Sequence, residues 1–180
     1  PASIPLAGLF DAVGSVTNQL MAVYEMGPWS TSVELAMVDK LASYLGWKEG
    51  SYAGFVTHGA SLANLNALLV ARNVALKDCW TAGLTDSDPR PVVVVQGDIH
   101  YSVARAAGIL GLGTNQVLKV GLDDRRRMDV QDLDRVLSEC REKGRTVIAV
   151  VACACSTSIG AFDPLNDVAD VCERHQVWLH

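Results

Sequence analysis

The 180 residues contain no hydrophobic run long enough to cross a lipid bilayer, and no signal peptide is visible in them. We therefore expect no membrane as a partner. Charged residues are also scarce, at 19%, and the net charge is −5. The one basic cluster, at residues 125–127, directly follows Asp123 and Asp124, a pattern typical of a solvent-exposed turn. The charge pattern thus argues against nucleic acid as a partner.

Cysteine is sparse and follows no disulfide framework. Its odd number and irregular spacing predict reduced thiols and hence a cytoplasmic protein. Two of the cysteines, Cys153 and Cys155, suggest an alternative, a zinc site completed by His175 or His180. No paired Cys-x-x-Cys motif supports that site, so we expect no metal. Cys155 as a catalytic thiol has no identified base. The five cysteines are Cys79, Cys140, Cys153, Cys155 and Cys172.

Several nucleotide and hydrolase motifs are missing as well. There is no phosphate-binding Gly-Lys-Ser/Thr loop, and Ser61 is not part of a Gly-x-Ser-x-Gly motif. The glycines in residues 108–113 have the wrong order for a dinucleotide-binding fingerprint, and they end a helical pattern instead of opening one. These absences argue against a nucleotide-binding protein and a serine hydrolase.

What is present is the pattern of an α/β protein. Hydrophobic residues make up 49% of the chain, and β-branched apolar runs alternate with amphipathic helical patterns from residue 91 onward. Such alternation predicts a mainly parallel sheet flanked by helices. We expect a short extended piece at 52–56 and strands at 91–95, 116–120, 146–152 and 177–179. Helices are expected at 7–20, from 30 or 31 to 45, and at 61–77, 102–110, 129–140 and 163–172.

Polar residues mark where these helices should begin. Thr31 and Glu34 have the spacing of a capping box, and Ser61 is a good N-cap. Asp129 and Asp163 each precede a helical pattern and are expected to cap it. Ser102 is a further candidate cap, Pro164 should occupy a first helical position, and His175 should cap a helix C-terminus.

Ligands of parallel α/β sheets bind beyond the carboxyl ends of the strands. Three segments qualify, and the first is the small-residue turn at 58–61, where His58 is expected to shape the turn. Backbone N–H groups and the helix dipole at this turn would suit a phosphate, although an ordinary capped helix that binds nothing is the alternative.

The other two segments carry His100 and Thr157. The imidazole of His100 would stack on a flat ligand and exchange protons, or it would only satisfy loop backbone groups. Thr157 would hydrogen-bond a cofactor, or it would belong to a plain turn. His180, at the end of the last apolar run, cannot be assigned a role from its neighbours in sequence.

Four blocks together resemble the group II pyridoxal-phosphate-dependent amino-acid decarboxylases, the family of aromatic amino acid, glutamate, histidine and diaminobutyrate decarboxylases. They follow one another in the family's order and cover nearly the whole chain. The blocks are Gly-Pro-Trp-Ser-Thr-Ser-Val-Glu (27–34), Thr-His-Gly-Ala-Ser-Leu-Ala-Asn-Leu (57–65), Asp-Ile-His-Tyr-Ser-Val-Ala-Arg-Ala-Ala (98–107), and Cys-Ser-Thr-Ser-Ile-Gly-Ala-Phe-Asp (155–163) with Val-Trp-Leu-His (177–180).

The resemblance implies a cofactor, pyridoxal 5'-phosphate (PLP), and a role for each matched residue. Ala60 and Ser61 would hold the phosphate. His100 would stack on the pyridine ring as the catalytic residue, Thr157 would lie near the ring's hydroxyl edge, and His180 would lie against the cofactor. Three further residues would line the substrate pocket of the partner subunit in a homodimer: Leu20, Met21 and Tyr24. Cys155, Ser156 and His58 depart from the family pattern.

The resemblance also implies a fold and a division of the chain. Residues 51–180 would be part of a PLP-dependent transferase-like (fold type I) large domain, and residues 1–50 a helical segment that packs on it. The ring-nitrogen Asp and the Schiff-base Lys of the family would follow His180, since none of the lysines matches. The chain starts at Pro1 without Met and ends in an apolar strand, so we expect a segment of a longer polypeptide.

The activity implied for the parent protein is decarboxylation of an L-amino acid to an amine and carbon dioxide, a lyase reaction of amino acid metabolism. One alternative keeps the fold and changes the reaction to that of an aminotransferase or another lyase. Another is that this segment alone is non-catalytic, because it lacks the Schiff-base lysine.

Overall fold

The computed structural model describes residues 4–84 and 90–180, and the chain separates into two compact units, Pro1–Thr57 and His58–His180. Each unit is described by itself. The division expected at residue 50, and the packing of the N-terminal segment on the large domain, stay predictions. No helix in the described part of the chain is long and apolar enough to cross a membrane.

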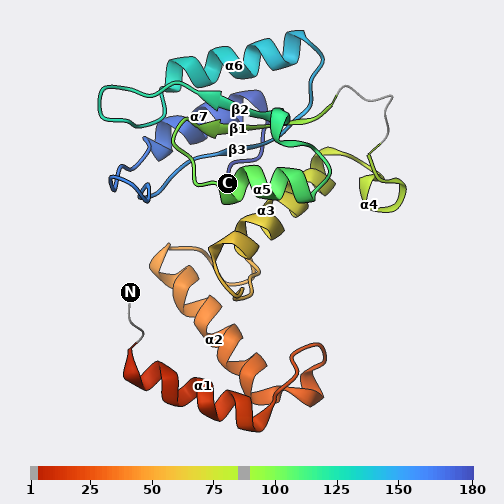
Figure 1. Ribbon diagram of the computed structural model, residues 1–180, viewed down its shortest axis with the longest axis vertical. Helices are drawn as coiled ribbons and strands as arrows, with labels where there is room; N and C mark the ends of the chain where they lie inside the picture. Colours follow the sequence, from red (N-terminus) through yellow and green to blue (C-terminus); the bar gives the residue numbers. More distant parts are fainter. Residues whose placement is uncertain (1–3, 85–89) are drawn as a thin grey trace. The chain divides into compact units, whose positions relative to one another are not determined.

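The first unit is helical (Figure 1). It contains α1 (Pro5–Thr17), the short 3-10 helix η1 (Tyr24–Met26) and α2 (Pro28–Tyr44). Helix α1 begins with a proline at its first position and ends at Asn18, whose left-handed backbone has φ of 43°. No residue of α1 is buried, so its apolar side chains are open to solvent.

The capping box predicted at the start of α2 is wrong. The helix begins three residues earlier, at Pro28, whose fixed φ suits a first helical position. The Glu34 carboxylate instead accepts a hydrogen bond of 2.8 Å from the N–H of Val56, and the Thr31 hydroxyl is buried without a hydrogen-bond partner. Glu34 therefore attaches the 52–56 segment, which forms no strand, to α2 within the first unit.

The second unit is built on a parallel sheet (Figure 1). Its strands are β1 (Val92–Gln96), β2 (Val117–Val120) and β3 (Val147–Val151), in the spatial order β2-β1-β3. Every residue of β1 is buried, as expected for the central strand of a sheet covered on both faces. The predicted fold class, a mainly parallel sheet flanked by helices, is confirmed.

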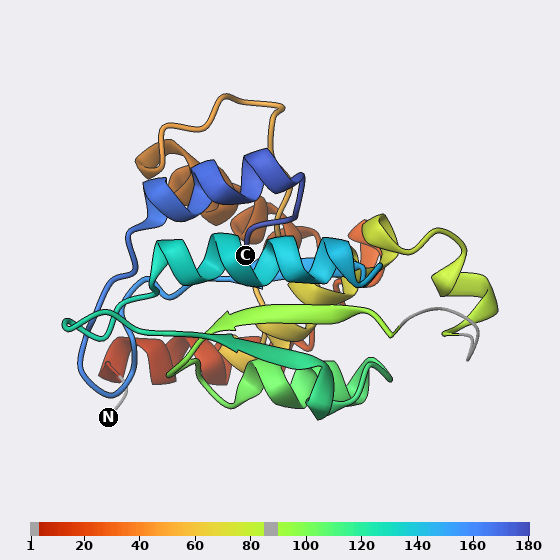
Figure 2. The same cartoon turned by 90° about the horizontal axis from the view of Figure 1, so that it is seen from above.

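Two helices cover each face of this sheet (Figures 1 and 2). Helices α3 (Ala60–Ala75) and α5 (Ser102–Ile109) pack on one face, and α6 (Val130–Glu142) and α7 (Leu165–His175) pack on the other. Alternate residues of β1 enter the two cores, with Val93 and Val95 on the α3 side and Val94 on the α6 side. The remaining helical turns are α4 (Cys79–Ala82) and η2 (Thr114–Gln116).

The chain ends beside β3. Leu179 forms an isolated parallel bridge with Val150, and the N–H of His180 donates to the Val150 carbonyl at 2.8 Å. The N–H of Ala152 in turn donates to the His180 carbonyl at 2.9 Å. The apolar run expected as a strand at 177–179 pairs with β3 only through an isolated bridge, and the backbone of His180 is held at the carboxyl end of the sheet.

Candidate active site

The small-residue turn leads directly into α3. Gly59 is the N-cap, and its φ of 94° lies in the region that favours glycine. The prediction that Ser61 caps this helix is wrong, because α3 begins at Ala60 and Ser61 is its second residue. No side chain caps α3, and within the described residues the N–H groups of Ala60 and Ser61 have no acceptor. These N–H groups lie at the positive end of the helix dipole, with Ser61 in the same first turn, and such a helix start suits an anionic group.

His100 lies between the end of β1 and the start of α5. Its Nδ1 is 2.8 Å from the Ser102 hydroxyl, and the backbone N–H of Ser102 points at the same nitrogen from 3.3 Å. The His100 ring also contacts the Tyr101 ring, with 4.2 Å between the centroids. Ser102 does not act as the expected helix cap, since it is the first residue of α5. The hydroxyl and the N–H of Ser102 hold the edge of the imidazole, while His100 itself stays exposed.

Asn64 connects this imidazole to the second histidine of the site. Its side-chain Nδ2 lies 2.8 Å from the Ser102 hydroxyl, and its Oδ1 lies 2.9 Å from Nε2 of His180. A hydrogen-bonded path therefore runs from His100 through Ser102 and Asn64 to His180. Asn64 is three residues after Ser61, which is about 4.5 Å along the helix axis, so the path passes beside the start of α3.

His180 is the more enclosed of the two histidines. It is held through its backbone by β3 and through its ring by Asn64. Burial lowers the pKa of His180, because removal of water disfavours the charged ring. The His180 ring is therefore neutral at neutral pH. No negatively charged side chain is needed beside its Nε2.

Thr157 lies on the loop after β3, exposed to solvent, and within the described residues no hydrogen bond joins it to the His100 path. The base of this loop is held by Asp163, whose buried carboxylate accepts from the N–H groups of Met128 at 2.7 Å and Cys153 at 2.6 Å. Asp163 does not cap α7, contrary to the prediction; Pro164 is the N-cap there. Cys155, on the same loop, has φ of 80°.

The structure thus brings together the start of α3, His100 and His180, but no contact adds Thr157 to them. The three predicted pocket residues, Leu20, Met21 and Tyr24, belong to the first unit and are exposed there. His58 is exposed at the start of the second unit. The site roles assigned from the sequence stay predictions.

Sequence reasoning did not identify Asn64 and Ser102 as site residues. Both occur in the quoted sequence blocks, so a signal existed. It was missed because their role depends on α3 and α5 packing side by side on the sheet, a pairing of residues 38 apart in the chain.

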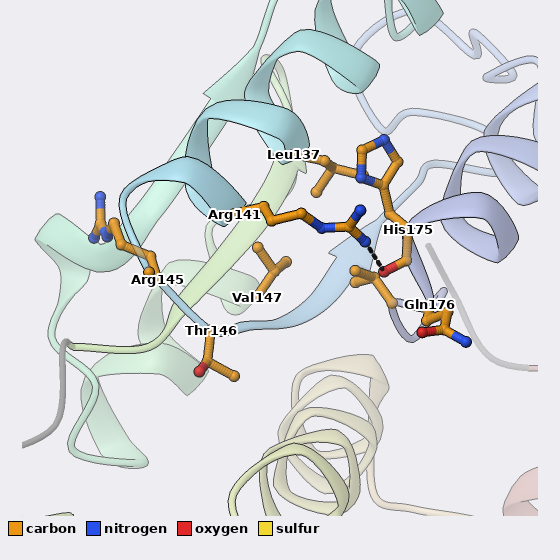
Figure 3. Close-up of a pocket in the computed structure, with 9 residues that line it drawn as sticks. Leu137, Arg141, Arg145, Thr146, Val147, His175 and Gln176 are labelled. Atoms are coloured by element: carbon orange, nitrogen blue, oxygen red, sulfur yellow. Dashed lines mark hydrogen bonds between the residues drawn. The ribbon is translucent and has the colours of Figure 1, made fainter.

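A separate hollow of about 310 Å³ lies where α6 and α7 end and β3 begins (Figure 3). It is lined by Arg141, Thr146 and His175 among others, and it contains none of the predicted site residues. The Arg141 guanidinium donates to the His175 carbonyl at 3.4 Å, and the His175 ring, predicted to cap the helix end, lies 3.0 Å from an oxygen of Asp134. Among residues 4–84 and 90–180, no three His, Cys, Asp or Glu side chains are grouped closely enough to hold a metal ion.

The parallel sheet, with the start of α3, His100 and His180 near its carboxyl edge, fits the class of PLP-dependent α/β proteins, because ligands of such sheets bind at that edge. The chain belongs to the pyridoxal-dependent decarboxylase family, because residues 3–180 match the model described as "Pyridoxal-dependent decarboxylase conserved domain". The resemblance seen in the sequence blocks is therefore confirmed, and PLP is the cofactor of the family.

Curated relatives include the human acidic amino acid decarboxylase GADL1, 37% identical over 163 residues, and the human cysteine sulfinic acid decarboxylase, 36% identical over 163 residues. The match covers 91% of this chain and 31% and 32% of those proteins, so the chain spans about a third of their length.

Among solved structures, mouse CSAD is 34% identical, with a TM-score of 0.92 over 99% of this chain and 37% of that one. The glutamate decarboxylase domain of a Vibrio parahaemolyticus protein is 28% identical, with a TM-score of 0.90 over 100% of this chain and 40% of that one.

Proposed function

We propose that the protein containing this chain is a PLP-dependent carboxy-lyase that converts an L-amino acid to the corresponding amine and carbon dioxide. The observation that carries the proposal is the hydrogen-bonded path from His100 through Ser102 and Asn64 to His180, beside the uncapped start of α3. Family membership supports the same reaction.

The residues present fit the cofactor. The free N–H groups of Ala60 and Ser61, with the Ser61 hydroxyl, are donors for its phosphate. The exposed His100 ring, held at its Nδ1 edge by Ser102, offers a face for stacking on a pyridine ring and an Nε2 proton for the substrate carboxylate. When bound, the cofactor supplies an electron sink for the pair left when carbon dioxide departs.

His180 and Thr157 take more limited roles in this proposal. Neutral His180 borders the cofactor without adding charge, which the lowered pKa of His180 supports. Thr157 would hydrogen-bond the ring's hydroxyl edge, and its exposure on the loop after β3 leaves the hydroxyl available. The ring-nitrogen Asp and the cofactor lysine would come from the parent protein outside these residues.

We propose acidic amino acids as the first substrates to test, because the relatives at 36% and 37% identity are named for acidic amino acid and cysteine sulfinic acid decarboxylation. The experiment expresses the full-length gene with PLP and measures carbon dioxide and amine released from aspartate, glutamate and cysteine sulfinate. A His100→Gln variant is expected to lose roughly 100-fold or more in kcat, as for a residue that transfers a proton in the transition state.

A His175→Gln variant is the matched control, since His175 lies in α7 and contacts Asp134 instead of the site. Amino-group transfer without carbon dioxide would contradict the decarboxylase proposal and favour the aminotransferase alternative. Absence of PLP binding by the full-length protein would favour a non-catalytic role.

We also propose that the parent protein is a homodimer in the cytoplasm. Helix α1 supports the first part, because it buries nothing and exposes a row of apolar side chains that a second copy would cover: Leu6, Leu9, Phe10, Val13 and Val16. The exposed Leu20, Met21 and Tyr24 follow on the same segment, which supports their place at the partner subunit's substrate pocket. The free state of all five cysteines supports a reducing compartment.

A further inference from the structure

The donor and the acceptor in each hydrogen bond between the two histidines can be assigned by starting from a group that can only donate. A backbone N–H can only donate, and that of Ser102 points at Nδ1 of His100 from 3.3 Å. Nδ1 is therefore an acceptor, and the neutral His100 ring carries its proton on Nε2, on the side away from α5. The Ser102 hydroxyl, 2.8 Å from the same Nδ1, then donates to it as well.

The remaining orientations follow from that first one. The Ser102 hydroxyl has one hydrogen, already given to His100, so it must accept from the Asn64 amide at 2.8 Å. This assigns Nδ2 of Asn64 to Ser102 and leaves Oδ1 for His180, whose Nε2 donates at 2.9 Å. Rotating the amide by half a turn would take the Ser102 hydrogen away from His100. Only with the Asn64 oxygen toward His180 are the two contacts of 2.8 Å from the Ser102 hydroxyl, to His100 and to Asn64, both hydrogen bonds.

We propose that Asn64 is a positioning residue: its amide directs the Ser102 hydroxyl onto Nδ1 of His100, and its oxygen selects the tautomer of His180 that carries the proton on Nε2. The inference rests on the proposed function for its catalytic consequence. Asn64 is suited to the role because a carboxamide is both a donor and an acceptor in a single plane. It is also held on a 16-residue helix that packs against α5 and β3, and Ser102, its partner, is only 1% exposed.

Asn64→Asp in the full-length protein is the sharpest test, because the shape is kept and the donor is lost. Two carboxylate oxygens accept from both His180 and Ser102, so the Ser102 hydroxyl turns away from His100. Asn66→Asp is the matched control: it adds the same charge to the same helix, and the Asn66 amide only donates to the Leu62 carbonyl within that helix.

The first readout does not depend on activity. Ring nitrogen NMR of the full-length protein labelled with 15N-histidine, without and with PLP, reports which nitrogen of each ring is protonated. The signals are assigned with His100→Gln and His180→Gln. We expect Nδ1 of His100 to be a hydrogen-bond acceptor in the wild type and in Asn66→Asp. In Asn64→Asp we expect that signal to move, because Nδ1 loses the Ser102 hydroxyl and keeps only the longer contact of 3.3 Å from the Ser102 N–H.

The second readout is kinetic. Asn64→Asp is expected to lower kcat by about 10- to 100-fold, the effect typical of a residue that orients a ligand side chain, with PLP content and Tm unchanged. Asn66→Asp is expected to stay within about twofold of the wild type. If Asn64→Asp keeps the wild-type ring signals, or the wild-type kcat, the inference is overturned.

The test also separates this inference from the proposed function. A wild-type protein that releases no carbon dioxide contradicts the proposed function, while the NMR result still decides the role of Asn64. If Asn64→Asp does not fold, Ser102→Ala replaces it, because it removes the hydroxyl between Asn64 and His100. The same displacement of the His100 Nδ1 signal is then expected, and an unchanged signal overturns the inference.

Discussion

His180 shows how burial at a single residue makes the folded state sensitive to pH. Burial lowers the pKa of His180 below its ordinary value of about 6.5, so the unfolded chain binds this proton more tightly than the folded one. The corresponding stability is present at neutral pH and is lost as the pH falls below about 6.5.

We therefore expect the free energy of unfolding of the full-length protein to fall between pH 7 and pH 5.5, and to fall less in His180→Gln. Urea unfolding of both proteins at the two pH values measures this difference. The lowered carboxylate pKa values of Asp123 and Asp132 act at lower pH and do not enter this window. Equal losses in wild type and variant would contradict the role assigned to His180.

Cys155 carries backbone strain that a glycine would relieve. Its φ of 80° lies in the left-handed region, which costs a non-glycine residue roughly 1–2 kcal/mol. We expect Cys155→Gly to raise the free energy of unfolding by about 0.5–1 kcal/mol, after the entropy that glycine adds to the unfolded chain. Ser158→Gly, in the same exposed loop but without a positive φ, should lower it, and urea unfolding of the full-length protein distinguishes the two.

Some residue roles could be predicted from the sequence and others could not, because tertiary packing decides which partner a polar side chain takes. Asp129 and Asp163 both precede a helix, and only Asp129 caps one, accepting from Gln131 and Asp132. Asp163 instead accepts from Met128, which is 35 residues away, and from Cys153 at the other end of its own loop. A local pattern shows that a carboxylate is available near a helix start, but the choice between cap and loop contact depends on tertiary packing.

At the scale of secondary-structure elements, the N-cap of α6 leads to a prediction about stability. The Asp129 carboxylate accepts from the Gln131 N–H at 2.9 Å and the Asp132 N–H at 3.2 Å. Asp129→Ala is expected to lower the free energy of unfolding of the full-length protein by about 1 kcal/mol, as for other N-caps. Asp124→Ala, exposed in the preceding loop, should change it by less than about 0.5 kcal/mol, and urea unfolding compares the two.

Strands β1 and β3 were predictable because their apolar runs are buried on both faces, and β2 because its β-branched residues still alternate with helical patterns. Val92–Gln96, Val117–Val120 and Val147–Val151 each lie within one or two residues of the expected ranges. Helix starts were predicted less well. Helix α2 begins at a proline, and α3 at a glycine cap, so at both starts backbone geometry decided the boundary instead of a polar side chain.

For the molecule as a whole, cofactor removal is expected to affect one side of the sheet. The proposed phosphate donors, Ala60 and Ser61, begin α3, whereas α6 and α7 cover the opposite face (Figure 2). In the full-length protein, we expect removal of PLP to speed hydrogen exchange at the start of α3 and around His100. Bound PLP stabilises only conformations in which its binding site is folded, so without it these segments open more often. Exchange in α6 should change little.

Hydrogen exchange measured by mass spectrometry, with and without PLP, tests this expectation. Faster exchange spread evenly over α6 and α3 would place the cofactor elsewhere. Topology alone predicts the carboxyl edge of the sheet as the general location, since ligands of parallel sheets bind there, and this location stays a prediction. The path through Asn64 was not predictable, because it depends on the packing of α3 against α5.

The hydrogen bond between Asn64 and His180 joins residues 116 apart in the chain. A growing polypeptide on the ribosome reaches His100 and Ser102 long before His180, so the His100 end of the path is complete while the Asn64 oxygen still faces water. His180, the neutral and desolvated end of the path, joins it only when residues 177–180 pair with β3. The path between the two histidines is thus completed only after β1, β2 and β3 have all been translated.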